Sequence, residues 1–130
     1  MRVYIAAPFG AREDVRRKAA ELEALGHEIT QRWFDGGPLD GNGAGNGAAA
    51  EALKRARADM AGIRACNLFV FLPGFSGTGG KHWERGFATA LGKRVADVGE
   101  PENVFGHLPG ERHATWEDLL EALRREACHD

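Results

Sequence analysis

Residues 67–88, NLFVFLPGFSGTGGKHWERGFA, decide the fold class. Asn67 to Leu72 is a near-continuous apolar run, which is typical of a parallel strand buried on both faces. A glycine-rich loop follows at 73–80, and residues 81–91 then carry the apolar spacing of a helix. A buried strand that leads through a glycine-rich loop into a helix indicates one βα unit of an α/β protein.

Strands and helices alternate along the rest of the chain. Alternation of this kind predicts right-handed βαβ units, and so an α/β fold with a single doubly wound parallel sheet and helices on both faces. Ligands of such sheets bind at the carboxyl ends of the strands, which selects the loops 7–13 and 73–80. The other expected strands are 2–6, 27–33 and 94–98, residues 100–110 are expected to be irregular, and the other expected helices are 11–25, 48–65 and 115–127.

Composition limits the classes of protein. The chain has 130 residues, which predicts one domain over 1–130, and its 43% apolar content is typical of a globular protein. The net charge of −2 gives no basic footprint for nucleic acid or an anionic membrane, and no apolar run is long enough for a membrane span. The N-terminus shows no signal-peptide core, and Cys66 and Cys128 suggest two reduced thiols, so we expect a cytoplasmic protein.

Glycine is over-represented. The chain has 18 glycines, a share well above the usual ~7%, and they form two main clusters. Gly74, Gly77, Gly79 and Gly80 lie at the mouth of the expected ligand crevice, where a bare backbone can come close to a ligand. The Gly36–Gly47 cluster is either a plain linker or a lid, and both interpretations stay open.

Asp59 lies on a stripe of the predicted helix 48–65 that should be buried. At 100° per residue it shares this stripe with Ala52, Ala56, Ile63 and Cys66. A lone buried carboxylate is costly, so it needs a partner, a raised pKa or a function.

Glu84 repeats this pattern in the next helix. It shares a face with Phe87, Ala88 and Leu91, and it lies in the first turn, where the helix N-terminus favours an ionised carboxylate near neutral pH. Tyr4, on the first strand, needs a hydrogen-bond partner if that strand is central, and a carboxylate across the crevice is a natural one.

Several common motifs are excluded. The loop before Lys81 resembles a phosphate-binding P-loop only superficially, because Lys81 is followed by His82 rather than Ser or Thr. The dinucleotide fingerprint fails at the same place, since no glycine stands three residues after Gly79. The histidines show no metal-ligand spacing, so we expect neither a metal nor another cofactor.

Four segments in order resemble the nucleoside 2-deoxyribosyltransferase superfamily: Tyr4–Phe9, Ala58–Ile63 with Asp59, Gly77–Ala88 with Glu84, and Gly92–Val95. The tail 102–109 is similar to a subgroup of small, phage-type members. The resemblance implies a flavodoxin- or Rossmann-like sheet.

The family's chemistry assigns roles by resemblance. Glu84 would attack the anomeric carbon of a 2′-deoxyribonucleoside and form a covalent glycosyl-enzyme, which a second base or water would resolve. Asp59 would bind or protonate the departing base, and Tyr4 would orient Glu84. A homodimer or larger homo-oligomer is implied, in which a neighbour's C-terminal segment closes the sugar pocket, with Asn103 as the residue in that role. The expected substrate-binding residues are Pro8, Phe9, Arg12, Gly77, Gly79, Gly80, His82 and Asn103.

Departures from the family pattern leave the substrate open. Residues 73–83 contain no acidic side chain for base recognition, and Asn67 stands where the family usually has Asp. A sister branch of the family hydrolyses deoxynucleoside 5′-monophosphates. Arg12 and Arg16 favour this alternative, whereas Pro8 speaks against it because it has no N–H to donate to a phosphate. We prefer the nucleoside site, with the monophosphate hydrolase as the alternative and a non-catalytic nucleotide-sensing module as a lesser one.

Overall fold

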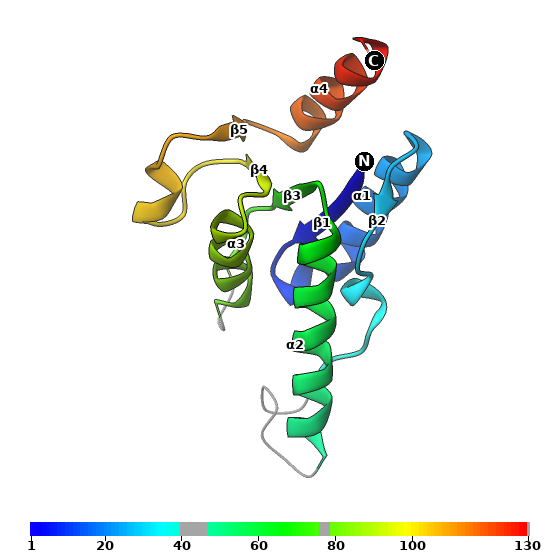
Figure 1. Ribbon diagram of the computed structural model, residues 1–130, viewed down its shortest axis with the longest axis vertical. Coiled ribbons are helices and arrows are strands. Elements are labelled where there is room, and N and C mark those ends of the chain that lie inside the picture. Colours follow the sequence, from blue (N-terminus) through cyan, green and yellow to red (C-terminus); the bar gives the residue numbers. More distant parts are fainter. Residues whose placement is uncertain (40–46, 76–78, 130) are drawn as a thin grey trace.

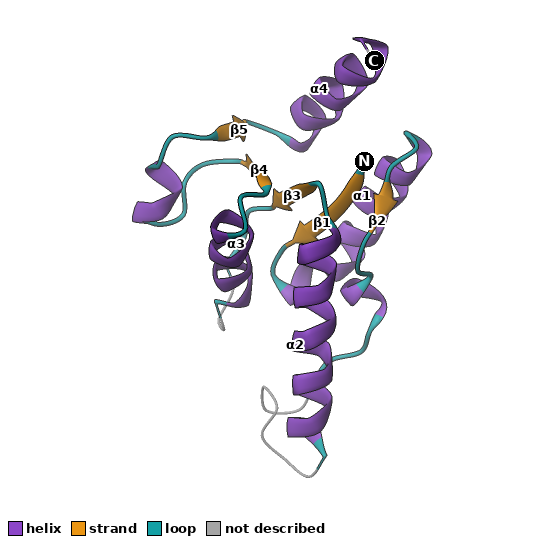
Figure 2. Cartoon of the chain, viewed as in Figure 1, coloured by secondary structure: helices purple, strands orange, loops and turns teal. Residues whose placement is uncertain are grey.

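The computed structural model describes residues 1–39, 47–75 and 79–129. Strands and helices alternate along the chain, as Figures 1 and 2 show. Among the described residues, no helix is both long enough and apolar enough to cross a membrane. The elements are β1 (Arg2–Ala6), η1 (Phe9–Ala11), α1 (Arg12–Ala24), β2 (Glu28–Ile29), η2 (Trp33–Asp35), α2 (Ala48–Ala65), β3 (Leu68–Phe71), α3 (Gly80–Ala90), β4 (Arg94–Val98), η4 (Val104–His107), β5 (Glu111–His113) and α4 (Trp116–His129).

The five strands form one parallel sheet in the order β2-β1-β3-β4-β5. The central pair is β1 and β3, in which Tyr4 lies opposite Phe69 and Ile5 opposite Val70. All four residues of β3 are buried, as the apolar run predicts. The strand order reverses direction between β1 and β3, and this is where ligands bind in open α/β sheets.

Helices cover both faces of the sheet, which confirms the doubly wound fold. Side chains of α1 and α4 pack with Val3 and Ile5 on one face. Ile63 of α2 and Ala88 of α3 pack with Tyr4 on the other. Neighbouring residues of a strand point to opposite faces, so Tyr4 points towards α2 and α3.

Two edge strands differ from the sequence prediction. The strand expected at 27–33 is only Glu28–Ile29, because the chain turns at η2 and the Trp33 indole Nε1 donates a 2.7 Å hydrogen bond to the Ile5 carbonyl oxygen. No strand was expected at β5, because its three residues are polar and show no apolar alternation. The strand β5 is held by its pairing with β4 and by an ion pair of 2.8 Å between Arg94 Nε and Glu111 Oε1.

Only part of the expected stripe on α2 is buried. Ile63 and Cys66 are in the core, but Ala56 is exposed and Asp59 is half-buried. The helix has 18 residues and is about 27 Å long at 1.5 Å per residue, so its first half extends past the short strands (Figure 1). The prediction that the whole stripe faces the core is therefore wrong for the first half of α2.

Candidate active site

Tyr4 and Glu84 are in direct contact. The Tyr4 side chain has no exposed surface, and its ring stacks on Phe69 with a centroid distance of 5.6 Å. Its hydroxyl donates a hydrogen bond to Oε2 of Glu84, in the second turn of α3. The buried phenol thus has the carboxylate partner that its place on a central strand requires.

Asp59 reaches the same region from α2. Its Oδ1 accepts a hydrogen bond of 3.3 Å from Gln31 Nε2. Three residues further along α2, a Cβ atom at Gly62 would lie only 2.6 Å from the Gln31 Cβ and 3.2 Å from the Tyr4 ring. Glycine at this position therefore lets α2 approach both Gln31 and Tyr4.

Burial dominates the protonation of these three groups. It raises the pKa of Glu84 to about 7; the Tyr4 hydrogen bond opposes the rise and the negative charge of Asp59 adds to it. Burial also raises the pKa of Asp59, although its Gln31 hydrogen bond and the Arg55 charge oppose this. The pKa of the Tyr4 phenol is raised far above its usual range, first by burial and then by Glu84 and Asp59.

The expected position and ionisation of Glu84 need a correction. The sequence predicts that it lies in the first turn, where the helix N-terminus favours an ionised carboxylate near neutral pH. The helix α3 begins at Gly80, so Glu84 lies in its second turn, and burial raises its pKa to about 7, where about half of the Glu84 side chains are ionised.

A pocket of about 630 Å³ lies beside the cluster, within the size range of small-molecule sites. Asp59 lines it from α2 and Gly80 lines it from α3. Tyr4 and Glu84 do not line this pocket; the lining residue of α3 is Gly80, four residues before Glu84 and on the same face of the helix. The other lining residues are Phe9, Gln31, Arg32, Trp33, Gly36, Pro38, Leu39, Ala52, Arg55 and Ala56.

Two solved structures are similar to this arrangement of strands and helices. One is a CMP N-glycosidase, BcmB, from Clostridium botulinum: 21% identity over 95% of this chain and 99% of the other, with a TM-score of 0.63. The other is a 2-deoxyribosyltransferase from the psychrotolerant bacterium Bacillus psychrosaccharolyticus: 21% identity over 92% and 90% of the two chains, with a TM-score of 0.68. This chain has the fold of these two enzymes.

Both enzymes match the superfamily that the sequence resembles. No protein-family model matches the sequence, and neither does any curated protein.

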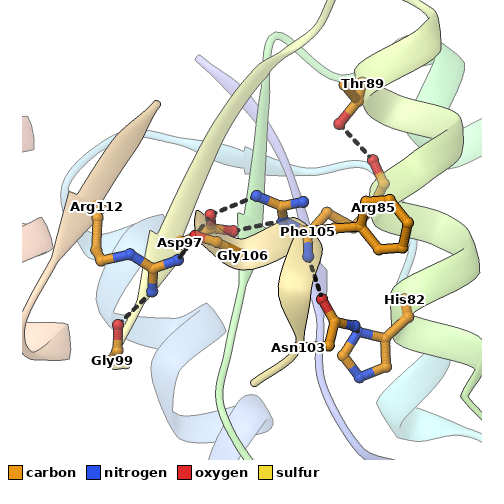
Figure 3. Close-up of polar contacts among 9 residues, drawn as sticks. All are labelled: His82, Arg85, Thr89, Asp97, Gly99, Asn103, Phe105, Gly106 and Arg112. Carbon is orange, nitrogen blue, oxygen red and sulfur yellow. Dashed lines mark hydrogen bonds and ion pairs between the residues drawn. The ribbon is translucent and has the colours of Figure 1, made fainter. Parts of the chain in front are cut away.

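Two of the expected substrate-binding residues lie in a second place on this fold. Asn103 Nδ2 is 3.2 Å from His82 Nδ1, and both line a separate pocket of about 440 Å³ beside α3 (Figure 3). His82 and Glu84 are two residues apart on a helix and therefore do not share a face. The same pocket holds Arg85, which donates two hydrogen bonds, of 2.8 and 2.6 Å, to the buried Asp97 carboxylate.

The residues after β1 lie near the first pocket. Phe9 lines it and stands 6.2 Å from Trp33, ring centroid to ring centroid. The Arg12 guanidinium lies 4.9 Å from the centre of the Phe9 ring. Pro8 contacts the next loop, where a Cβ atom at Gly74 would be only 2.9 Å from the Pro8 Cγ.

The glycine-rich loops are described in part. Gly79 has φ +72° and forms the N-cap of α3, and Gly80 is the first residue of that helix. Gly77 lies outside the described residues, as does most of the Gly36–Gly47 cluster.

The pocket residues that the sequence does not predict include Gln31, Trp33 and Arg55. Gln31 and Trp33 belong to the expected strand 27–33, and Arg55 lies off the apolar stripe of its helix. Arg55 Nε donates to Glu51 Oε1 at 3.1 Å, and its Nη1 donates to the Gly37 carbonyl, which joins α2 to the segment after η2. One signal in the sequence points to Trp33: it is the last residue of an expected strand, and ligands bind at the carboxyl ends of the strands.

No metal site is found in the part of the chain that the structure describes. In 1–39, 47–75 and 79–129, no three His, Cys, Asp or Glu side chains are grouped so that they could hold a metal ion. Cys66 is buried, Cys128 is exposed, and both are free thiols.

Proposed function

We propose that this protein cleaves the N-glycosidic bond of 2′-deoxyribonucleosides and transfers the sugar to another base. The observation that carries the proposal is the Tyr4–Glu84 hydrogen bond, with Asp59 close enough to raise the pKa values of both and a small-molecule pocket beside them. The 2-deoxyribosyltransferase among the similar structures supports the reaction class.

The first step forms a covalent bond to Glu84. An ionised Glu84 oxygen attacks C1′ of the deoxyribose while the C1′–N bond breaks, through an oxocarbenium-like transition state. The electron pair of that bond leaves with the base, and Asp59 donates a proton to it. The raised pKa of Asp59 increases the protonated fraction that this role requires.

The second step releases Glu84. A nitrogen of a second base attacks C1′, the ester bond to Glu84 breaks with its electron pair on the carboxylate, and Asp59 takes up the proton that this base loses. Tyr4 stays protonated and holds the Glu84 carboxylate in place throughout. Phe9 is partly exposed at the pocket, where its ring offers a face on which a base can stack.

A substrate panel tests this function. The protein is incubated with deoxynucleosides and with their 5′-monophosphates, with and without a free acceptor base. We expect base exchange with the nucleosides, and a mass increase of one deoxyribosyl group on Glu84 after acid quenching. Glu84→Ala should abolish both, whereas Glu117→Ala, at an exposed position on α4, should retain them.

The alternative is N-glycosidic hydrolysis of 2′-deoxynucleoside 5′-monophosphates. The CMP N-glycosidase among the similar structures favours hydrolysis of a nucleoside 5′-monophosphate, although CMP has a ribose and not a deoxyribose. The Arg12 guanidinium lies over Phe9 near the pocket. Arg16 is a poorer phosphate ligand, because it already donates to Glu13, Asp35 and the Phe34 carbonyl. Base release from monophosphates alone would favour this alternative, and no release from any compound would favour a sensing module.

The proposal includes a homo-oligomer in the cytoplasm, where the two free cysteines would stay reduced. Within one chain, Asn103 joins His82 and not the Tyr4–Glu84 pair. Val104, Phe105 and Leu108 beside it are 74%, 64% and 61% exposed, which is unusual for large apolar side chains.

Complementation between two inactive variants tests this assembly. If Asn103 serves a neighbour's site, a mixture of Asn103→Ala and Glu84→Ala should recover about a quarter of the activity of the native dimer, since random mixing leaves one intact site in half of the dimers. A mixture as inactive as its components, or a monomeric mass in solution, contradicts the shared site.

A further inference from the structure

Glu102, in the segment after β4, holds the loop between β3 and α3 at both ends. Its Oε2 accepts a 2.8 Å hydrogen bond from the backbone N–H of Gly74. Its Oε1 accepts a 2.5 Å hydrogen bond from Nζ of Lys81, in the first turn of α3. One carboxylate therefore ties together two positions that are seven residues apart.

Lys81 is an unusual partner because it is buried. Its side chain has no exposed surface, and its Nζ also donates to the Leu72 carbonyl at 3.1 Å and lies 4.6 Å from the centre of the Phe71 ring. A buried ammonium group is costly unless a counter-charge and hydrogen bonds compensate it. Glu102 supplies the counter-charge, so the position of one group depends on the other.

The Gly74 end of the loop is fixed by its surroundings as well. Gly74 has φ +133°, a conformation that favours glycine, and it packs against the Pro8 ring. Next to it, Pro73 lies against Gly99, where an added Cβ would meet the Pro73 ring at 3.3 Å. The segments after β1, β3 and β4 are thus in contact at one edge of the sheet, and Glu102 closes this contact.

The Lys81 end leads directly to the reacting carboxylate. Glu84 is three residues after Lys81 on the same helix, so a shift of the first turn of α3 moves Glu84 relative to Tyr4 on β1. A displacement of 1 Å in a catalytic group is enough to reduce a rate strongly.

We propose that Glu102 is a positioning residue, which clamps Gly74 and Lys81 so that Glu84 meets Tyr4. This inference rests on the proposed function, because it concerns the same carboxylate. The clamp requires an ionised Glu102, and this condition holds near pH 7, where Glu84 titrates. Burial alone would raise the pKa of Glu102, but Lys81, the Gly74 N–H and His82, whose Nε2 lies 3.8 Å from Oε1, outweigh it and lower the pKa, so Glu102 stays ionised there.

Glu102→Gln is the test variant, because glutamine keeps the shape but has one acceptor oxygen and no charge. We expect kcat to fall about tenfold or more while KM changes by less than about threefold. Since Glu84 also loses part of its Tyr4 hydrogen bond, the acidic limb of the pH–rate profile should move up by about 0.5 pH unit. Glu117→Gln, at an exposed position, is the matched control.

A second measurement does not depend on activity. Hydrogen exchange of the Gly74 amide should be about tenfold faster in Glu102→Gln than in the native protein. In Glu102→Gln the buried Lys81 ammonium loses its counter-charge, which could unfold the protein. The double variant Lys81→Met/Glu102→Gln removes that ammonium and is the variant to use if the single variant does not fold. Its kcat should be close to that of the Glu102→Gln single variant, since both break the same clamp.

The outcomes distinguish a failure of the proposed role of Glu102 from a failure of the proposed function. Faster exchange with native kcat and an unshifted pH profile would show that Glu102 is only structural, and unchanged exchange would refute the clamp itself. If the native protein cleaves no nucleoside or nucleotide, the proposed function fails and the role of Glu102 in it fails too, while the exchange result still reports on the contact.

Discussion

The Tyr4 hydroxyl donates its hydrogen bond to Glu84 across 80 residues of sequence. Tyr4 is buried in a central strand of the sheet, and Glu84 is half-buried in the helix that follows β3. The bond stabilises the ionised form of Glu84 against the burial that favours the neutral form. Tyr4 therefore sets the balance between protonated and ionised Glu84, and this balance can be measured.

Tyr4→Phe should lower the activity and move its pH dependence. The phenyl ring keeps the stacking on Phe69 but removes the donor, so the pKa of Glu84 rises above its native value of about 7. We expect kcat to fall at pH 7 by about one to two orders of magnitude, with partial recovery at higher pH. A pH–rate series of both proteins checks this; an unchanged acidic limb would mean that the hydrogen bond does not control Glu84.

The native protein itself should lose activity on the acidic side of neutrality. In the proposed mechanism Glu84 must be ionised to attack, and burial raises its pKa to about 7. Below that pH, kcat/KM should fall about tenfold for each pH unit, because the ionised fraction falls by that factor. Full activity at pH 5 would contradict Glu84 as the nucleophile of the free enzyme.

Glu84→Gln should stabilise the fold at high pH. Between the ordinary value of 4.5 and the folded value of about 7, the native state binds more protons than the unfolded state, so native stability falls as the pH rises through this window. Glutamine does not titrate and avoids a loss on the order of 3 kcal/mol. Denaturant unfolding of both proteins at about pH 4 and pH 8 measures it.

The stability difference between Glu84→Gln and the native protein should be small at the lower pH and largest at the higher one. Glu117→Gln serves as the control, since this carboxylate is exposed and its replacement should have little effect at either pH. A difference that is equal at both pH values would mean that burial does not destabilise ionised Glu84.

Gly62→Ala should disturb the contact between α2 and the sheet. The new methyl group would lie 2.6 Å from the Gln31 Cβ, so α2 or Gln31 must move, at a cost of about 1–3 kcal/mol. Because Gln31 donates to Asp59, activity should fall as well. Thermal unfolding and base-release assays check both effects.

Gly86→Ala is the matched control for that substitution. Gly86 is also helical, but nothing lies within 4 Å of an added Cβ, so alanine should stabilise α3 by about 0.5–1 kcal/mol. Equal effects at Gly62 and Gly86 would show that the close approach of α2 is unimportant.

The sequence predicts those parts of the molecule that follow from burial. The apolar run of β3 and the helical periodicities give the sheet and its two helical layers, and the buried phenol of Tyr4 requires a partner such as Glu84. The expected strand 27–33 contains β2 but is too long, because the turn at η2 depends on the contact of Trp33 with β1. The strand β5 is not predicted, because its three polar residues show no alternation.

Within one chain, His82 lies at a different pocket from Asp59 and Gly80, since a helix directs neighbouring positions to different sides. Asn103, which is expected to serve a neighbour's site, lies beside His82. Gln31 was missed because its role depends on a contact with Asp59 between distant segments. Periodicity reports which face of an element is buried, and it does not report which side chains meet there.

The strand order has a consequence for redesign. The residues that wall the pocket opposite α3, such as Gln31, Trp33 and Arg55, come from the β2 edge and from α2. The Glu102 contacts lie on the β4 side of the same central pair of strands. Libraries that vary this β2-side wall but keep Gln31 and Arg55, which both act on the Asp59 carboxylate, would therefore sample new ligand shapes and leave the Glu102 contacts unchanged.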